Sequence, residues 1–287
     1  FLYPPRNLQA EANTSTTSGA AILTWEAPIG GDYAVTGSIP RTSTPIATAE
    51  YSAMVTQHTG GDNSDAMWDI LLEFMLATVG NAGTETDGTY IYVTIWSGGG
   101  FRSFDLAGNF VEEFNISGVN SIRDLAYNTD NGHMYGGNNG NTLYEMDFTN
   151  KVLVGSVSSA GAPIRHISYN PNLDGGNGGF YLGDWSSMRS VKMDGSTIAN
   201  APGYALSGSY GSGYDPVNDV IWVFDQGGAG VDLVEFDAET MVATGNMHDA
   251  STDLTLYAGG TAGGLAFTNL LVSGRYVMLG LVQADHI

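Results

Sequence analysis

The sequence predicts an all-β protein whose main part is a β-propeller, and two observations support this. Short runs of β-branched and aromatic residues, bounded by Gly, Asn and Asp, fill most of the 287 residues, 40 of which are glycines. A longer unit also recurs, opening with IRDLAYN at Ile122, IRHISYN at Ile164 and YGSGYD at Tyr210. Units of about 40–50 residues with four short strands are typical of propeller blades, which are stable only when packed against their neighbours.

Shorter units flank these three repeats. One begins at Asp87 without its first strand, and a weaker one begins at Gly263 and offers three strands. The apolar run 68–76 (WDILLEFML) precedes the first unit, so it is the natural donor of a strand that completes the last blade. We therefore predict a five-bladed propeller over residues 65–287, closed by strand 68–76, with six blades as the alternative.

The first 28 residues carry a different pattern. PPRNLQAEAN and AILTWEAP, on either side of a Ser/Thr-rich turn, predict a single pair of strands, and residues 29–64 are expected to form an extended linker. Two strands alone bury too little surface to be stable and leave apolar edges exposed. Some other surface must therefore cover the apolar residues of this arm, which are Leu8, Ile22, Leu23 and Trp25.

Three arrangements would cover the arm. It could fold back on the flank of its own propeller, or it could be the remnant of a trimmed domain. It could also add its strands to a sheet of a neighbouring copy. Repeated head to tail, this last contact does not close and builds a filament.

The repeats resemble the secreted and surface propellers of Bacteroidetes-type bacteria, which are often exported by the type IX system. The resemblance rests on IRDLAYN, FYLGDWSS, IWVFDQGG and AGGLAFT and covers most of residues 68–283. Such relatives often carry fibronectin type III modules, and residues 1–28 resemble the first two strands of one. Residues 29–60 depart from that pattern because the remaining strands are missing. The resemblance implies an extracellular or cell-surface location.

Charge and composition argue against several kinds of partner. The chain has 9 Lys and Arg against 30 Asp and Glu, and its net charge of -21 repels nucleic acid. The absence of cysteine rules out disulfides and thiolate metal sites. The sequence contains no run of about 18 apolar residues, so it predicts no membrane span. Because the chain starts at Phe1 without a signal-like segment, we expect a mature, processed or trimmed product.

Aromatic and polar side chains follow the second strand of each predicted blade. Equivalent positions in a propeller gather near one mouth of the central channel, where such side chains suit the recognition of sugars. Packing between blades is the alternative role for them. The candidate ligand-binding residues are Trp96, Asn138, Asp184, Trp185, Asp225 and Gln226.

Two charged pairs occupy the same place in adjacent repeats. Arg123–Asp124 and Arg165–His166 fall on the expected innermost strands, where they could form a salt-bridged ladder. In a propeller lyase or hydrolase they would instead supply an anion clamp and an acid/base group. The sequence contains no G-x-S-x-G, no H-E-x-x-H and no phosphate loop, so we assign no catalytic residue.

One loop approximates the first half of a calcium site. Asn170, Asn172 and Asp174 alternate and are followed by Gly175, but Tyr181 stands where the bidentate Glu of such a loop belongs. A hairpin turn is the alternative, since Asn, Asp and Gly readily adopt turn conformations. No other cofactor is expected.

Together these features predict a non-enzymatic, extracellular structural or adhesive protein that assembles with other copies of itself through its N-terminal arm. A filament subunit is one form of this prediction. A carbohydrate-binding module is the first alternative, and a propeller lyase or hydrolase is the second.

Two sequons, at Asn13 and Asn115, would suit N-linked glycans on the surface.

Overall fold

The computed structural model describes residues 67–76, 80–159, 163–228, 230–283 and 287 in full, and only the backbone of four short strands before residue 58. The chain divides into two compact units, residues 1–51 and 52–287.

The first unit contains a small antiparallel sheet. Strand β1 (Arg6–Ala12) pairs with β2 (Ala21–Glu26), and β2 pairs with β3 (Gly37–Ile39). Strand β3 falls within the range expected to be an extended linker. The side chains of Leu8, Ile22, Leu23 and Trp25 lie outside the part of the chain whose side chains the structure describes, and so does Asn13.

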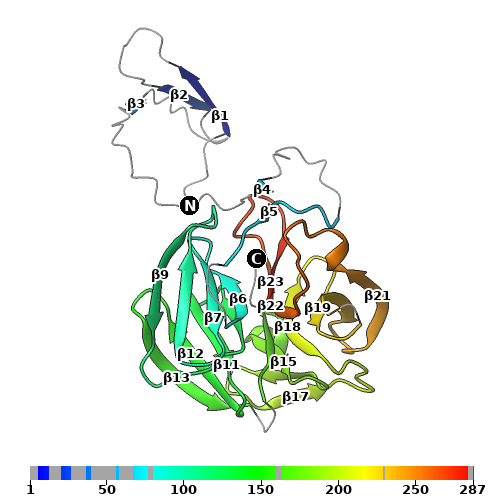
Figure 1. Ribbon diagram of the computed structural model, residues 1–287. Helices are drawn as coiled ribbons and strands as arrows, with labels where there is room; N and C mark the ends of the chain where they lie inside the picture. Colours follow the sequence, from blue (N-terminus) through cyan, green and yellow to red (C-terminus); the bar gives the residue numbers. More distant parts are fainter. Residues whose placement is uncertain are drawn as a thin grey trace. The chain divides into compact units, whose positions relative to one another are not determined.

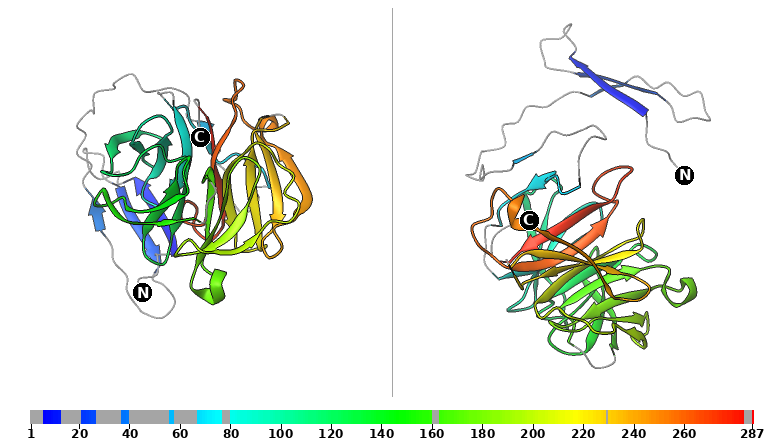
Figure 2. Two further views of the ribbon diagram at one scale, coloured as in Figure 1. Left: turned by 90° about the horizontal axis from the view of Figure 1, so that it is seen from below. Right: turned by 90° about the vertical axis from the view of Figure 1, so that its right-hand side faces the viewer.

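Four antiparallel sheets of four strands make up most of the second unit, in a propeller arrangement (Figures 1 and 2). Each strand pairs with the next one along the chain, as the repeats predict. Two details differ from the prediction: the unit expected to lack its first strand has one, at residues 81–86, and the unit expected to offer three strands from Gly263 forms a sheet of two in the described residues. The sheets are β6 (Asn81–Thr86), β7 (Ile91–Ile95), β8 (Gly100–Phe104), β9 (Phe110–Asn115); β10 (Asp124–Asn128), β11 (His133–Gly137), β12 (Thr142–Asp147), β13 (Val152–Ser158); β14 (His166–Asn170), β15 (Gly179–Gly183), β16 (Arg189–Lys192), β17 (Thr197–Asn200); and β18 (Ser209–Asp215), β19 (Val220–Asp225), β20 (Asp232–Asp237), β21 (Ala243–Asp249).

Shorter elements complete this unit. Strand β22 (Ala262–Thr268) pairs with β23 (Val277–Val282), and β4 (Thr56–Gln57) pairs with β5 (Leu72–Glu73). Just after β5, Phe74 and Ile287 exchange two backbone hydrogen bonds of 2.8 and 3.0 Å. The segment expected to close the propeller is therefore bonded to the C-terminal residue. In the described residues, helical structure is limited to the single turns α1 (Leu173–Gly176) and η1 (Ala250–Thr252).

The first strands of the sheets meet at the centre. Strand β10 contacts β6 and β14, β18 contacts β14 and β22, and β22 contacts β6. Glycines allow this close approach, because a Cβ on Gly264 would lie 2.2 Å from the backbone nitrogen of Thr84 and one on Gly211 would lie 2.4 Å from the carbonyl oxygen of Gly263. The strands thus approach backbone to backbone, and glycine is required at these positions.

The core consists of apolar layers between consecutive sheets, and β19 shows how the sequence builds them. Ile221 and Val223 point into the layer shared with the preceding sheet, whereas Trp222 and Phe224 point into the layer shared with β22 and β23. Because successive strand residues face opposite sides, a strand packed between two layers is apolar throughout. This explains the run VIWVF at residues 220–224.

Candidate functional site at one end of the central strands

Three side chains at equivalent positions of consecutive sheets meet where the central strands begin. Arg123 and Arg165 directly precede β10 and β14, and their backbone N–H groups bond to Gly137 and Gly183 at the ends of the adjacent strands. Tyr210 holds the corresponding position in β18. The repeat therefore brings two guanidinium groups and a phenol to the same end of the propeller.

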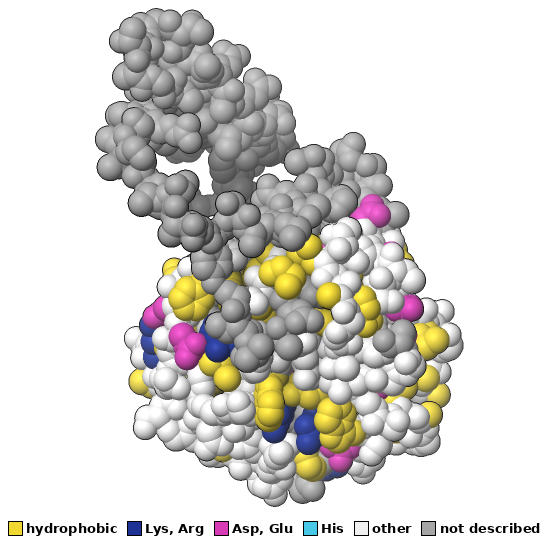
Figure 3. All heavy atoms as spheres, in the orientation of Figure 1, with side chains coloured by type: hydrophobic (Ala, Val, Ile, Leu, Met, Phe, Trp, Pro, Cys, Tyr) yellow, Lys and Arg dark blue, Asp and Glu magenta, His cyan; other side chains and the backbone are white. Residues whose placement is uncertain are grey.

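Tryptophans border both arginines. The guanidinium carbon of Arg123 lies 5.5 Å from the ring centroid of Trp96, and that of Arg165 lies 4.3 Å from the ring centroid of Trp185. The Trp185 ring also meets the ring of Tyr210 edge to face, with centroids 5.5 Å apart. We call these five residues, Arg123, Arg165, Tyr210, Trp96 and Trp185, the mouth. Figure 3 shows that basic side chains (dark blue) and hydrophobic ones (yellow) lie next to each other on one face of the molecule.

The mouth carries excess positive charge. Burial and the nearby charge of Arg123 lower the pKa of Arg165. Burial raises the pKa of Tyr210, although the two arginines act in the opposite direction, so this phenol stays protonated at neutral pH. The Nε atom of Arg123 is buried and has no hydrogen-bond partner in the structure. A bound anion would satisfy that donor and relieve the repulsion between the two arginines.

The other residues predicted for ligand binding lie at the same end, but their side chains bond to the protein. Asn138 accepts a hydrogen bond from the Gly140 N–H, and Asp225 accepts from Gly208 and Gly227. The side chain of Gln226 donates to the Ala262 carbonyl at 2.6 Å, which joins two sheets. Such contacts within the protein fit the alternative given for these three residues, which was packing between blades rather than ligand binding.

Asp184 is an acidic residue that directly precedes Trp185 of the mouth. Burial acts to raise its pKa, but hydrogen bonds from Ser186 and Ser187 outweigh that effect and hold the pKa below its usual value. Its charge also favours the charged form of Arg165. Asp184 is therefore ionised and half-buried beside the mouth.

His166 does not reach the mouth. It is fully buried, its Nε2 lies 3.1 Å from the Ser187 carbonyl oxygen, and its Nδ1 lies 3.3 Å from the Ser212 hydroxyl. Burial lowers the pKa of His166 to about 4, so the ring is neutral at physiological pH. This is the environment of a structural histidine, and the acid/base role considered for it is not supported by its position.

Two carboxyl groups on the central strands, those of Asp124 and Glu85, are buried. The sequence singled out Asp124 together with Arg123 as part of a salt-bridged ladder, whereas Glu85 was not singled out. Asp124 Oδ2 accepts from the backbone N–H groups of Ile167 and Ser212, and Glu85 accepts from those of Thr86 and Tyr127. Burial raises the pKa of Glu85 to about 8 and raises that of Asp124 well above its usual value. These acids bind N–H groups on the inner edges of the sheets.

The residues considered for calcium are engaged elsewhere. The side chain of Asn170 accepts from the N–H of Asn172 and donates to the Tyr181 hydroxyl. Asp174 has a positive φ of 51° and forms an ion pair with Lys192 at 2.8 Å. The fully described ranges contain no group of three or more His, Asp or Glu side chains placed to hold a metal ion. Asn115, the sequon residue within these ranges, ends β9 and is exposed.

No known protein family and no curated protein matches the sequence. The fold is similar to the crystal structure of a glutaminyl cyclase from Myxococcus xanthus, with a TM-score of 0.57 and 16% identity over 75% of this chain and 92% of that chain. A hydrazine synthase from Kuenenia stuttgartiensis matches with a TM-score of 0.43 and 13% identity, over 59% of this chain and 49% of that chain. At such identities the likeness shows the fold alone.

The match corrects one prediction. We predicted that the chain is not an enzyme, and that prediction is overturned because the fold that fills three quarters of this chain is also the fold of an enzyme. A propeller accommodates both binding and catalysis, so the function must be argued from the site. No helix within the described ranges has the length and apolar character needed to cross a membrane.

Proposed function

We propose that the mouth binds a small carboxylate-bearing ligand, with a sugar acid as the preferred class. The observation that carries this proposal is the convergence of Arg123 and Arg165 from equivalent positions of adjacent sheets, each bordered by a tryptophan. Guanidinium groups suit carboxylates because their parallel N–H groups can bond to both oxygens of the acid.

Long-range charge favours a small ligand over a polyanion. The net charge of -21 repels polyanionic chains at distances up to a Debye length, about 8 Å at physiological ionic strength. A single carboxylate that reaches the mouth instead meets two arginines. Trp96 is 44% exposed, so its ring can stack against the ring of a sugar while the carboxylate bonds to the arginines.

Tryptophan fluorescence can test this proposal with a matched pair of ligands. Glucuronate and glucose share a ring and differ at the carboxylate, so we expect glucuronate to quench the fluorescence and glucose to have little effect. Arg165→Gln should abolish the response. Lys192→Gln removes one positive charge at the opposite end of its sheet and is the control. Equal responses to both sugars, or an unchanged response in Arg165→Gln, would contradict the proposal.

A second candidate is the cyclisation of an N-terminal glutamine, because the fold match covers 92% of a glutaminyl cyclase. In that reaction the α-amine attacks the side-chain amide carbon and the carbonyl oxygen gains negative charge. The attacking nitrogen then loses a proton, the amide nitrogen gains one, and the carbon–nitrogen bond of the amide breaks to release ammonia. Asp184 could accept the proton of the α-ammonium group, and Arg165 could stabilise the negative oxygen. Mass spectrometry of glutamine-initiated peptides should show the loss of ammonia, and Asp184→Asn should stop it. A peptide that loses ammonia no faster with the protein than in buffer would exclude this reaction.

We also infer a five-bladed closed ring, with β22 and β23 as the inner strands of the fifth blade. Apolar layers between all consecutive pairs of sheets support this count, including one that joins Ala266 and Leu279 to Ile91 and Val93. The bonds between Phe74 and Ile287 support closure by the segment 68–76. An experimental density map that resolves the strands tests the count of five blades, and a sixth sheet in the ring would contradict it.

Self-association at an extracellular surface remains a separate proposal. Its support is the sheet β1–β2–β3, which has β1 at one edge and a three-residue strand at the other. Exposed strand edges readily add strands from other chains. Electron microscopy of the full chain and of a chain without residues 1–51 tests it. Single particles in both samples would exclude assembly through this unit.

A further inference from the structure

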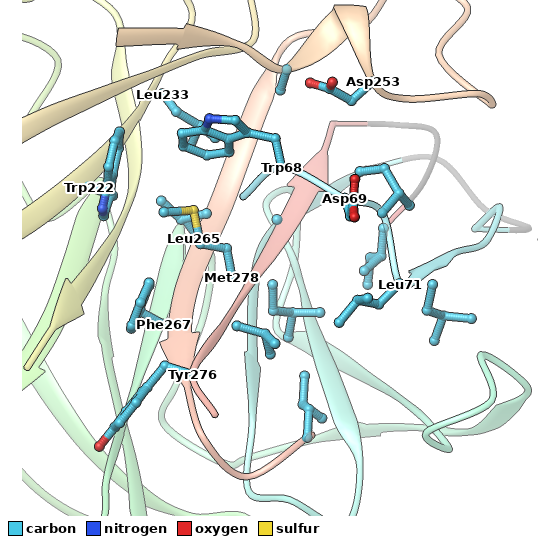
Figure 4. Close-up of a pocket in the computed structure, with 18 of the residues that line it drawn as sticks. Trp68, Asp69, Leu71, Trp222, Leu233, Asp253, Leu265, Phe267, Tyr276 and Met278 are labelled. Atoms are coloured by element: carbon cyan, nitrogen blue, oxygen red, sulfur yellow. The ribbon is translucent and has the colours of Figure 1, made fainter. Parts of the chain in front are cut away.

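A cavity of about 860 Å³ lies between the sheet β18–β21 and the pair β22–β23. Figure 4 shows Trp222 and Leu233 on one side and Leu265 and Met278 on the other. The cavity exists because β22–β23 has two strands where the neighbouring sheet has four, so part of that sheet's apolar face is left uncovered. Its volume is within the range of small-molecule sites, and no residue of the mouth lines it.

Trp68 forms an aromatic wall of this cavity. Its ring stacks on His248 with centroids 4.0 Å apart and an interplanar angle of 3°, and it meets the ring of Trp222 edge to face at 5.3 Å. The backbone of Trp68 has a φ of 77°, which is strained for a bulky residue. Such strain persists only where the surroundings fix the conformation, and it is concentrated at functional sites.

The charged lining is mainly acidic. Four acidic residues line the cavity, namely Asp69, Asp215, Glu235 and Asp253. The basic lining residues are Arg275 and His248, and His248 is bonded to Asp253. Aromatic faces attract cations, and carboxylates strengthen that attraction. The cavity therefore differs from the mouth in polarity and in charge. It is mainly apolar, and its charge has the opposite sign, so the two sites should take different ligands.

We propose that this cavity binds a small organic cation with an apolar ring system, such as an arylalkylamine. The ring lies among Trp68, Trp222, Leu265 and Met278, and the ammonium group lies toward the carboxylates. The proposal does not depend on the ligand of the mouth, because the two sites share no residue.

A series of ligands with one ring and three charges tests both parts. Naphthylmethylamine, naphthylmethanol and naphthylacetate can each be titrated calorimetrically into the full chain. We expect the amine to bind more tightly than the alcohol and the acid, with a margin that shrinks as salt is added. Glu235→Gln should weaken binding of the amine by roughly two- to fivefold and leave the alcohol unaffected.

Gly280 offers a way to block the cavity without removing a core side chain. It lies on β23, where a Cβ would meet Leu265 and Phe224 at 3.7 Å, an ordinary contact, so Gly280→Leu would fill the space. Gly155→Leu on the outer strand β13, where a Cβ would lie 4.0 Å from Oε2 of Glu145, also an ordinary contact, is the control. We expect Gly280→Leu to abolish binding of the amine and Gly155→Leu to preserve it.

Three results would overturn the proposal. Unchanged binding to Gly280→Leu would show that the ligand lies elsewhere, and equal affinities for the three ligands would remove the preference for a cation. If Gly280→Leu fails to fold, as judged by its thermal unfolding, the smaller Gly280→Ala replaces it and should weaken binding. Absence of any heat with all three ligands would also exclude the site.

Discussion

Oδ2 of Asp124 lies 3.2 Å from the backbone nitrogen of Ser212, 88 positions later in the chain and two sheets away. The same oxygen accepts from the N–H of Ile167 in the sheet between them. Inner strands of a propeller have one edge without a partner strand, so their N–H groups need other acceptors. Asp124 provides one for two strands at once, and it ties three sheets together at the centre of the ring.

Removal of this carboxyl group should be costly. We expect Asp124→Ala to lower the free energy of unfolding by about 2–5 kcal/mol, because two buried N–H groups lose their acceptor. Asp124→Asn keeps an acceptor of the same shape and should cost much less. Urea unfolding of the three proteins measures the difference. Equal stability of the Ala and Asn variants would show that these hydrogen bonds contribute little.

Glu85 predicts a stability that depends on pH. Burial raises its pKa to about 8 in the folded chain, so the carboxyl group holds its proton more tightly there than in the unfolded chain. Its contribution is complete below the unfolded pKa and is lost as pH rises through about 8. As pH rises from about 5 to 8, the free energy of unfolding of wild type should therefore fall relative to that of Glu85→Gln. A difference that stays constant over this range would contradict the burial of an acid at this position.

His166 predicts the opposite trend. Its folded pKa of about 4 lies below the ordinary value, so the unfolded chain takes up a proton first as the solution is acidified. Wild type should lose stability relative to His166→Asn as pH falls from about 6.5 to 4. Denaturant unfolding at several pH values measures this. If the ring instead titrates near 6.5 by nuclear magnetic resonance, His166 is accessible and the structural role is wrong.

Close approach of the central strands makes the response to an added methyl group depend on position. Gly264→Ala places a Cβ 2.2 Å from the nitrogen of Thr84 and should destabilise the fold by about 3 kcal/mol or more. Gly280→Ala on β23 adds the same group at ordinary contact distance and should cost less than about 1 kcal/mol. Thermal unfolding of the two variants compares them directly. Similar losses would mean that the strands do not approach as closely as described.

The repeat explains how much of this molecule could be predicted from its sequence. Tyr127, Tyr169 and Tyr214 occupy the same place in IRDLAYN, IRHISYN and YGSGYD, so the three sheets that contain them and the equivalence of Arg123 with Arg165 followed from spacing alone. Strand β6 was missed because the first unit has no such tyrosine. The contacts of these arginines with tryptophans did not follow from the repeat. Trp96 reaches Arg123 from the turn after β7 in the preceding sheet, whereas Trp185 reaches Arg165 from the turn after β15 in the same sheet.

Contacts between sheets were beyond that reasoning. The acceptor role of Asp124 joins strands far apart in the sequence, and it needs the closed geometry before it can be seen. The positive φ of Trp68 and the burial of His166 are likewise imposed by surrounding packing and leave no local signal. Strand β3 has three residues, too few for a periodic pattern to show.

Closure of the ring predicts a coupling between Phe74 and Ile287, whose side chains share one apolar layer and whose backbones exchange two hydrogen bonds. Both are almost fully buried, at 1% and 7% exposure, so Phe74→Ala should cost about 3–5 kcal/mol and Ile287→Ala about 2–4 kcal/mol. If the two ends support each other, the double variant should lose less than the sum of the single losses, by at least about 0.5 kcal/mol. Phe74→Ala combined with Met146→Ala, which lies in a different layer, is the matched control and should be additive. Additivity in both pairs would mean that the segment before the first sheet does not close the ring with Ile287. Coupling in the first pair alone would locate the closure where these two residues meet.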